Sequence, residues 1–129
     1  MKITQSYGIK FKGGYKAVKR TIVIFNDAVN YLITPVQDHY DAIAVLDTSL
    51  KKMNYVEKLV HHTKGNKAVY DFDNKFYKFP SYLRRSAITK AVGIVSSYMS
   101  QMEKWKANNC KGAMPKLDMA NHLMPCFYK

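Results

Sequence analysis

The sequence predicts an α+β fold that is predominantly helical, with three or more helices and short β-strands at the N- and C-terminal ends. Two observations predict the helices: apolar residues recur every three or four positions over 15–38 and over 81–107. A third observation, alternation of mostly apolar and polar residues over 2–12, predicts the first strand. The 129 residues suit a single module, and the 47% of hydrophobic residues are enough to form a core.

The N-terminal segment 1–12 is expected to form a strand with two unlike faces. Its apolar and aromatic side chains fall on one face, and its lysines, among them Lys10, fall on the other. Gly13-Gly14 ends the strand, because consecutive glycines favour a turn.

The first helix is predicted over 15–38, where the apolar stripe runs from Val18 to Val36. Pro35 should bend or end this helix near Thr34. Three bases stand at its N-terminal end: Lys16, Lys19 and Arg20. They oppose the helix dipole there, so their position favours phosphate binding over helix stabilisation.

A second helix is predicted over about 49–62, with the residues from Asp47 to Ser49 offering N-caps. Its expected apolar face consists of Leu50, Met53, Val56 and Val60.

The longest helix is predicted over 81–107, with Ser81 as its N-cap. Its apolar residues from Ile88 to Trp105 repeat every seven positions, a pattern suited to packing along another helix. Arg84 and Arg85 lie in its first turn. Residues 15–107 would thus form a helical lobe, followed over 108–129 by a loop and a short terminal strand.

The charge of the chain is large and unevenly placed. The formal net charge is +12, divided as +6 over 1–20, −4 over 21–48, +10 over 49–116 and zero beyond. Such a balance favours a polyanionic partner, with nucleic acid first and an anionic membrane surface second. A merely solvated basic surface is the alternative explanation.

Several classes of protein do not fit the sequence. No run of 18 apolar residues is present, and the N-terminus lacks the apolar stretch of a signal peptide. The two cysteines are too few for a disulfide scaffold. We therefore expect a cytoplasmic protein that does not enter a membrane.

The sequence offers little for catalysis or for cofactor binding. Phosphate-binding loops, dinucleotide fingerprints and nucleophile elbows are absent. His61 and His62 could serve a ribonuclease, but neighbours on a helix point about 100° apart. Cys110, Cys126 and His122 fall one short of the four ligands of a structural zinc site. No metal and no cofactor are expected.

Bases alternate with aromatic residues between positions 67 and 85. Bases hold phosphates, and exposed rings stack on unpaired nucleotide bases, although half or more of these rings should belong to the core. Tyr82 is predicted to stack, and the bases to contact phosphate. The predicted nucleic-acid contacts are Lys10, Lys16, Lys19, Arg20, Tyr82, Arg84 and Arg85.

The order of several short motifs is informative. They are the lysine-rich opening strand with Tyr7 and Lys10, Phe25-Asn26 in the first helix, Phe79-Pro80-Ser81 followed by Arg84-Arg85-Ser86-Ala87-Ile88, Trp105, Lys111-Gly112, Met114-Pro115 and Met124-Pro125-Cys126-Phe127-Tyr128. In this order they resemble the N-terminal part of the TnpB (OrfB) proteins of bacterial insertion sequences, which are related to the type V CRISPR effectors. The resemblance spans nearly the whole chain, but each motif is short. Gly13-Gly14 also replaces the Tyr-Pro and Gln-bearing turn that is usual in the family.

The resemblance implies a role in RNA-guided DNA cleavage. In that family, a β-barrel wedge domain carries an inserted helical lobe that helps to hold guide RNA and the guide–target duplex. The RuvC-like nuclease centre and the zinc ribbon lie beyond the region matched here. We therefore expect a non-catalytic, nucleic-acid-binding fragment of a larger protein, with guide RNA and DNA as partners and self-association through unpaired strand edges.

Two alternatives stay open at this point. One is a stand-alone helical DNA- or RNA-binding regulator, and the other is a small ribonuclease that depends on His61 or His62.

Overall fold

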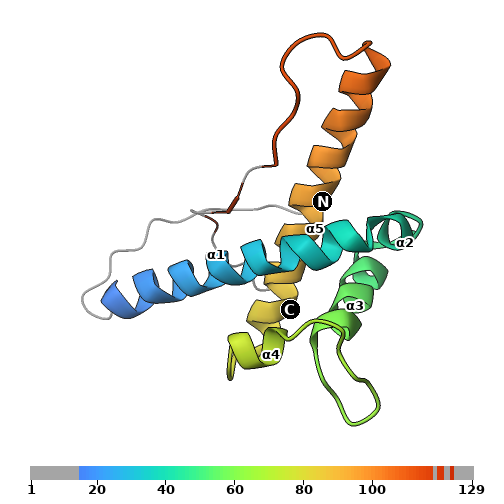
Figure 1. The fold of residues 1–129 in the computed structure, drawn as a ribbon. Helices are drawn as coiled ribbons and strands as arrows, with labels where there is room; N and C mark the ends of the chain where they lie inside the picture. Colours follow the sequence, from blue (N-terminus) through green and yellow to red (C-terminus); the bar gives the residue numbers. More distant parts are fainter. Residues whose placement is uncertain (1–14, 118, 121–122, 124–129) are drawn as a thin grey trace, which may run out of the picture.

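The computed structural model describes residues 15–117, 119–120 and 123, and all the regular elements in these residues are helices (Figure 1). In chain order they are α1 (Tyr15–Asp38), α2 (Tyr40–Ala44), α3 (Ser49–Val60), α4 (Phe72–Lys75) and α5 (Ser81–Ala107).

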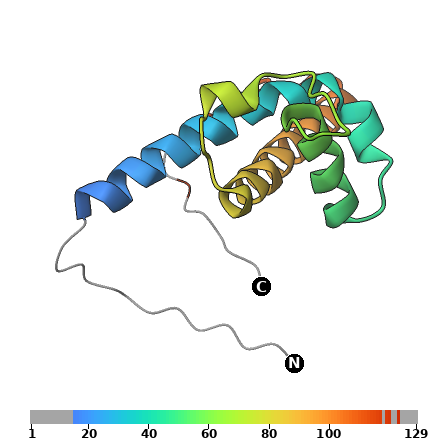
Figure 2. The ribbon, with the colours of Figure 1, turned by 90° about the horizontal axis from the view of Figure 1, so that it is seen from below.

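Two long helices that cross one another, α1 and α5, organise the fold. The C-terminal half of α1 packs across the N-terminal half of α5, while the other half of each helix projects beyond the crossing (Figures 1 and 2). The shorter α3 also packs on α5, and α2 connects α1 to α3.

The core fills the crossing between α1 and α5 and extends to the shorter helices. On α1 the stripe from Phe25 to Val36 is buried, and on α5 the stripe from Ala87 to Val95 is buried. The shorter helices contribute Ile43, Val56, Val60 and Phe72. The three-and-four spacing predicted the buried faces at the crossing, because that spacing places side chains along one side of a helix. It extended both stripes too far, since the residues at their outer ends, Val18 and Ile22 on α1 and Met102 and Trp105 on α5, are not part of the core.

The predicted α+β class is wrong. The described residues contain no β-strand, and the only strand-like pairing among them is an isolated bridge between Thr63 and Asn66. The segments predicted as strands, 1–12 and the end of the chain, lie outside the described residues, as do the strand edges expected to self-associate.

The three long predicted helices are confirmed to within two residues at each end, but details at their ends differ. Pro35 does not end α1, which continues to Asp38, because this proline is fully buried in the core and packing outweighs one missing hydrogen bond. Pro80, not Ser81, occupies the N-cap of α5, and no side chain caps that end. Thr48 caps α3 by accepting a hydrogen bond from the Lys51 amide at 3.2 Å. Leu50, which was predicted to face the core, is 63% exposed.

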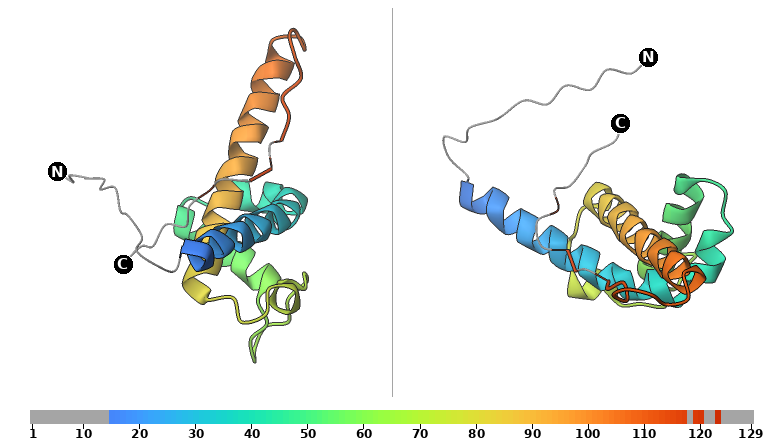
Figure 3. Two further views of the ribbon diagram at one scale, coloured as in Figure 1. Left: turned by 90° about the vertical axis from the view of Figure 1, so that its left-hand side faces the viewer. Right: turned by 90° about the horizontal axis from the view of Figure 1, so that it is seen from above.

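The chain reverses after α5 and runs back toward α1 (Figure 3). Three residues of the reversal, Asn109, Cys110 and Gly112, adopt left-handed backbone angles, with φ of 56°, 59° and 82°. We call the described residues that follow the tail (113–117, 119, 120 and 123).

Two asparagines on α1 hold the tail by its main chain. The Asn30 side chain donates to the Ala120 carbonyl at 2.8 Å and accepts from the Ala120 amide at 2.6 Å. The Asn26 side chain pairs with Leu123 in the same way, at 3.0 and 2.9 Å. Each amide group therefore satisfies both backbone groups of one tail residue, as a neighbouring strand would.

Candidate nucleic-acid interface

The residues predicted to bind nucleic acid fall in two separate places, and Lys10 lies outside the described residues. Lys16, Lys19 and Arg20 are exposed on the N-terminal end of α1, which projects beyond the crossing (Figure 2). Tyr82, Arg84 and Arg85 lie in the first turn of α5. The structure does not bring the two groups together, because α1 contacts α5 through its other half.

Arg84 is not on the surface where the sequence placed it. It is only 6% exposed, and its Nε lies 3.7 Å from Oε2 of Glu57 on α3. Arg85, which is exposed, donates from its Nε to the same oxygen at 3.2 Å. One carboxylate thus serves two guanidinium groups, and the Nε of Arg84 has no hydrogen-bond partner within the described structure.

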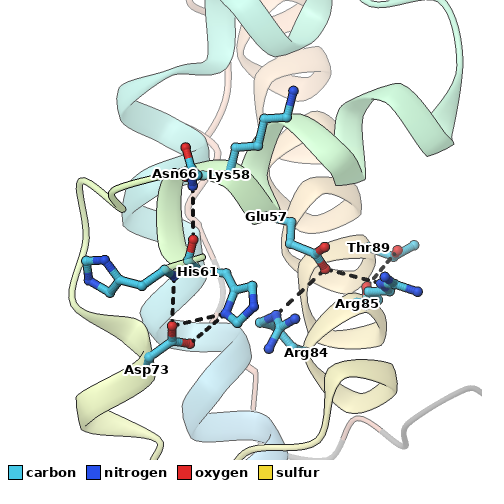
Figure 4. Close-up of polar contacts among 9 residues, drawn as sticks. Glu57, Lys58, His61, Asn66, Asp73, Arg84, Arg85 and Thr89 are labelled. Carbon is cyan, nitrogen blue, oxygen red and sulfur yellow. Dashed lines mark hydrogen bonds and ion pairs between the residues drawn. The ribbon is translucent and has the colours of Figure 1, made fainter. Parts of the chain in front are cut away.

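A histidine–aspartate pair stands near Arg84 (Figure 4). The carboxylate of Asp73 on α4 accepts from Nδ1 of His61 at 3.0 Å and from the backbone amide of His62 at 2.9 Å. The network therefore fixes the His61 proton on Nδ1. The Asn66 side chain donates to the carbonyls of Lys58 and His61, which holds the turn after α3 in place.

A pocket of about 300 Å³ separates the loop after α3 from the start of α5. It is lined by His61, Asp73, Asn74, Phe76, Tyr77, Lys78, Phe79 and Arg84. Its wall thus combines cationic, aromatic and hydrogen-bonding groups, which is the chemistry that nucleotides require.

The pocket belongs to a basic end of the molecule, residues 58–85, which we call the α4 end; it comprises the last turn of α3, the following loop, α4 and the start of α5 (Figure 1). Its exposed bases are Lys58, Lys64, Lys67, Lys75, Lys78 and Arg85. Tyr77 and Tyr82 are 77% and 59% exposed, respectively. The other rings of the segment pack inward: Phe72 is buried, and Phe76 and Phe79 pack against it. The expectation that half or more of these rings belong to the core is confirmed.

The sequence identified several residues of this site, but it did not identify the side chains with which they pair. The predicted contacts did not include Asp73, yet it anchors His61 from the short helix α4. The burial of Arg84 was detectable, because counting back four positions from Ile88 continues the apolar stripe of α5 to position 84.

The described residues show neither a membrane-crossing element nor a metal centre. No helix among them has both the length and the apolar character that crossing a bilayer requires. No three histidine, cysteine or acidic side chains among them are arranged to hold a metal ion.

Comparison with known protein families shows the family of this chain. A family model matches residues 4–129, which includes both groups of predicted contacts. The chain belongs to the Aq_aa04 family. No match was found among the curated proteins or among the solved structures. Membership of the Aq_aa04 family does not test the resemblance to TnpB proteins, which stays a prediction.

Proposed function

We propose that the protein binds nucleic acid through the α4 end. The observation that carries the proposal is that five exposed lysines and the exposed rings of Tyr77 and Tyr82 lie on the same end of the molecule. Lysines contact phosphates without reading sequence, and exposed rings stack on unpaired bases. The partner that fits best is therefore a single-stranded or locally opened nucleic acid.

Three acids lie in or beside the α4 end, namely Glu57, Asp71 and Asp73, and two of them are partly satisfied within the protein. Asp73 already accepts hydrogen bonds from His61 and His62, so its charge is partly satisfied within the protein. Glu57 is only 19% exposed and faces two arginines. Asp71 is the exposed acid of the α4 end, against six exposed bases, so the exposed charge of this end is mainly positive.

The finer form of the proposal is that the chain is the non-catalytic binding module of a TnpB-like protein, with guide RNA and DNA as its partners in the cytoplasm. This form rests on the order of the motifs from Phe25-Asn26 to Met124-Pro125. Coding sequence downstream with RuvC-like acidic residues and Cys-x-x-Cys pairs would support it. Downstream sequence without them would contradict it and favour a stand-alone regulator.

The salt dependence of binding tests the main proposal. If six phosphates are neutralised, the affinity for a short single strand should fall about 300-fold between 50 and 200 mM salt, as measured by fluorescence anisotropy. A binding constant that does not change with salt would contradict a phosphate-contacting surface.

A matched pair of triple variants locates the surface. Lys58→Gln, Lys64→Gln and Lys67→Gln together remove three exposed charges of the α4 end, and they should lower the slope of log K against log salt by about 2–3. Lys104→Gln, Lys106→Gln and Lys111→Gln remove the same charge near the far end of α5 and should leave the slope unchanged. Equal losses in the two variants would mean that the α4 end is not the binding surface.

A second candidate function is favoured by the contact between His61 and Asp73. A carboxylate that holds Nδ1–H leaves Nε2 free to accept a proton, as metal-independent RNA cleavage requires. In the presence of EDTA, His61→Gln should then abolish RNA cleavage while His62→Gln retains it. Absence of cleavage by the unmodified protein would eliminate this candidate.

A further inference from the structure

The buried Arg84 carries positive charge that its protein partners offset only in part. Glu57 is the single carboxylate in ion-pair contact with it among the described residues, at 3.7 Å, and the same oxygen lies closer to Arg85. The Nε of Arg84 donates no hydrogen bond within the described structure. A charge removed from water is costly unless it is paired and hydrogen-bonded, so this guanidinium favours an additional anion.

The pocket of about 300 Å³ gives such an anion access to Arg84. Arg84 forms part of its wall, together with His61 and Lys78. Figure 4 shows the Arg84 guanidinium directed toward the His61 ring. Asp73 lines the same wall, but no ion pair joins it to Arg84 among the described residues, and it accepts hydrogen bonds from His61 and His62 instead.

The bases in the pocket wall, Arg84 and Lys78, favour a phosphate monoester. A guanidinium presents a planar fork of donors that matches phosphate oxygens, and the Lys78 ammonium adds a second positive charge. A monoester carries a charge of about −1.5 to −2, whereas an internal phosphodiester carries about −1. The volume accommodates one phosphate with part of a nucleotide, and the ring of Tyr77 lines the same wall.

We propose that this pocket binds the terminal phosphate of a nucleic-acid strand. A strand end can enter a recess directly, whereas an internal phosphate would have to carry both of its neighbours into the same space. The inference rests on the proposed function, because it assigns to the α4 end a preference for phosphorylated strand ends in addition to its contacts along the backbone.

Three otherwise identical short strands test the pocket: one with a 5′-phosphate, one with a 3′-phosphate and one with hydroxyls at both ends. At a single salt concentration, at least one phosphorylated strand should bind about tenfold or more tightly than the hydroxyl strand, corresponding to about 1.4 kcal/mol. Inorganic phosphate at millimolar concentration should compete and remove this difference.

Variants of the two neighbouring arginines form a matched comparison. Arg84→Lys keeps the charge opposite Glu57 but removes the fork of donors, and it should abolish the preference for the phosphorylated strand. Arg85→Lys changes a side chain that does not line the pocket and should retain the preference. Because Arg84 is buried, circular dichroism must show that its variant is folded. Lys78→Gln provides a second reading, since it should weaken the preference without altering the buried ion pair.

The outcomes distinguish the proposal for the pocket from the proposal for the α4 end as a whole. Equal affinities for all three strands, with the salt dependence retained, would overturn the pocket and leave the proposed function standing. Failure of every strand to bind would overturn the proposed function. Calorimetry with inorganic phosphate alone would then show whether the pocket binds an anion. Binding of phosphate that Arg84→Lys removes would support an anion site, and absence of binding would overturn it.

Discussion

Asn26 is a polar residue whose place in the structure is set by main-chain atoms far along the chain. Its side chain is buried, donates to the Ile22 carbonyl at 2.7 Å and makes both of the hydrogen bonds that tie Leu123 to α1. Because the backbone groups of Leu123 have this one partner among the described residues, loss of the amide would leave them unpaired.

Asn26→Ala should therefore lower the free energy of unfolding by about 1–3 kcal/mol, as measured by urea denaturation. Asn54→Ala, on the exposed side of α3, is the matched control and should change it by less than about 0.5 kcal/mol. Equal stabilities of the two variants would mean that the contact with the tail contributes nothing to the fold.

Tyr70 links the stability of the protein to alkaline pH. Burial of its ring raises the pKa of Tyr70. The nearby Asp38 carboxylate, which accepts a hydrogen bond from the Tyr70 hydroxyl at 2.9 Å, raises it further. A group whose pKa is raised by folding stabilises the folded state below its unfolded value and loses that contribution as the pH rises through its folded value. Stability should thus fall above about pH 10.

Urea denaturation at several pH values between about 8 and 11 would measure this fall. Tyr70→Phe should show a smaller fall than the unmodified protein, because it has no proton to lose at this position. Part of the fall should persist in the variant, since burial and Asp71 also raise the pKa of Tyr31. A stability that is constant over this range would contradict the assignment.

At this scale, sequence reasoning found residues better than it found their partners. Arg84 and Arg85 were selected as bases, and the apolar stripe of α5 contained the signal that one of them is buried. Their shared partner Glu57 could not be predicted, because the contact depends on how α3 packs on α5 rather than on spacing within one helix.

Among the elements, α5 contains one position that lowers its own stability. Gly93 lies in the middle of this helix, and a methyl group added there would meet no atom within 4 Å. Glycine costs a helix interior about 0.5–1 kcal/mol relative to alanine.

Gly93→Ala should therefore raise the free energy of unfolding by about 0.5–1 kcal/mol, which thermal denaturation would detect as a higher Tm. Gly112→Ala is the contrasting variant: space is equally open there, but its φ of 82° disfavours alanine, so this variant should lower the Tm. A lower Tm for Gly93→Ala would contradict the open space beside this residue.

The elements also show where a single sequence stops being informative. Periodicity located α1, α3 and α5 because it records which side of a helix is buried. The helices α2 and α4 have five and four residues, too few for a repeat to be visible. The contact between Asn30 and Ala120 joins residues 90 positions apart, and no local pattern encodes such a distance.

Viewed as a whole molecule, the protein has an unevenly distributed core. The buried side chains of α5 end at Val95, and its last core contact is made by Met99. Beyond this point the helix projects past the crossing with α1 (Figure 1). The Trp105 indole donates to the Gly112 carbonyl at 3.3 Å, one of the few contacts of this end.

Hydrogen exchange should reflect this distribution. Backbone amides of 100–107 should exchange faster than those of 84–95, because their hydrogen bonds can open without disturbing the core. Mass spectrometry of peptides from the two parts of α5 would measure the difference. Equal protection would mean that α5 opens only together with the entire fold.

The asparagine contacts also bear on how relatives of this protein should vary. Asn26 and Asn30 touch only main-chain atoms of Leu123 and Ala120, so their hydrogen bonds do not depend on which side chains the tail carries. Substitution within the tail should then be frequent in evolution except at Leu117, Ala120 and Leu123, which pack in or against the core, whereas insertion or deletion between its two contact points should be rare. Selection would preserve the number of residues between the two contact points and the two asparagine side chains that bind them. The residues between these points would vary more freely.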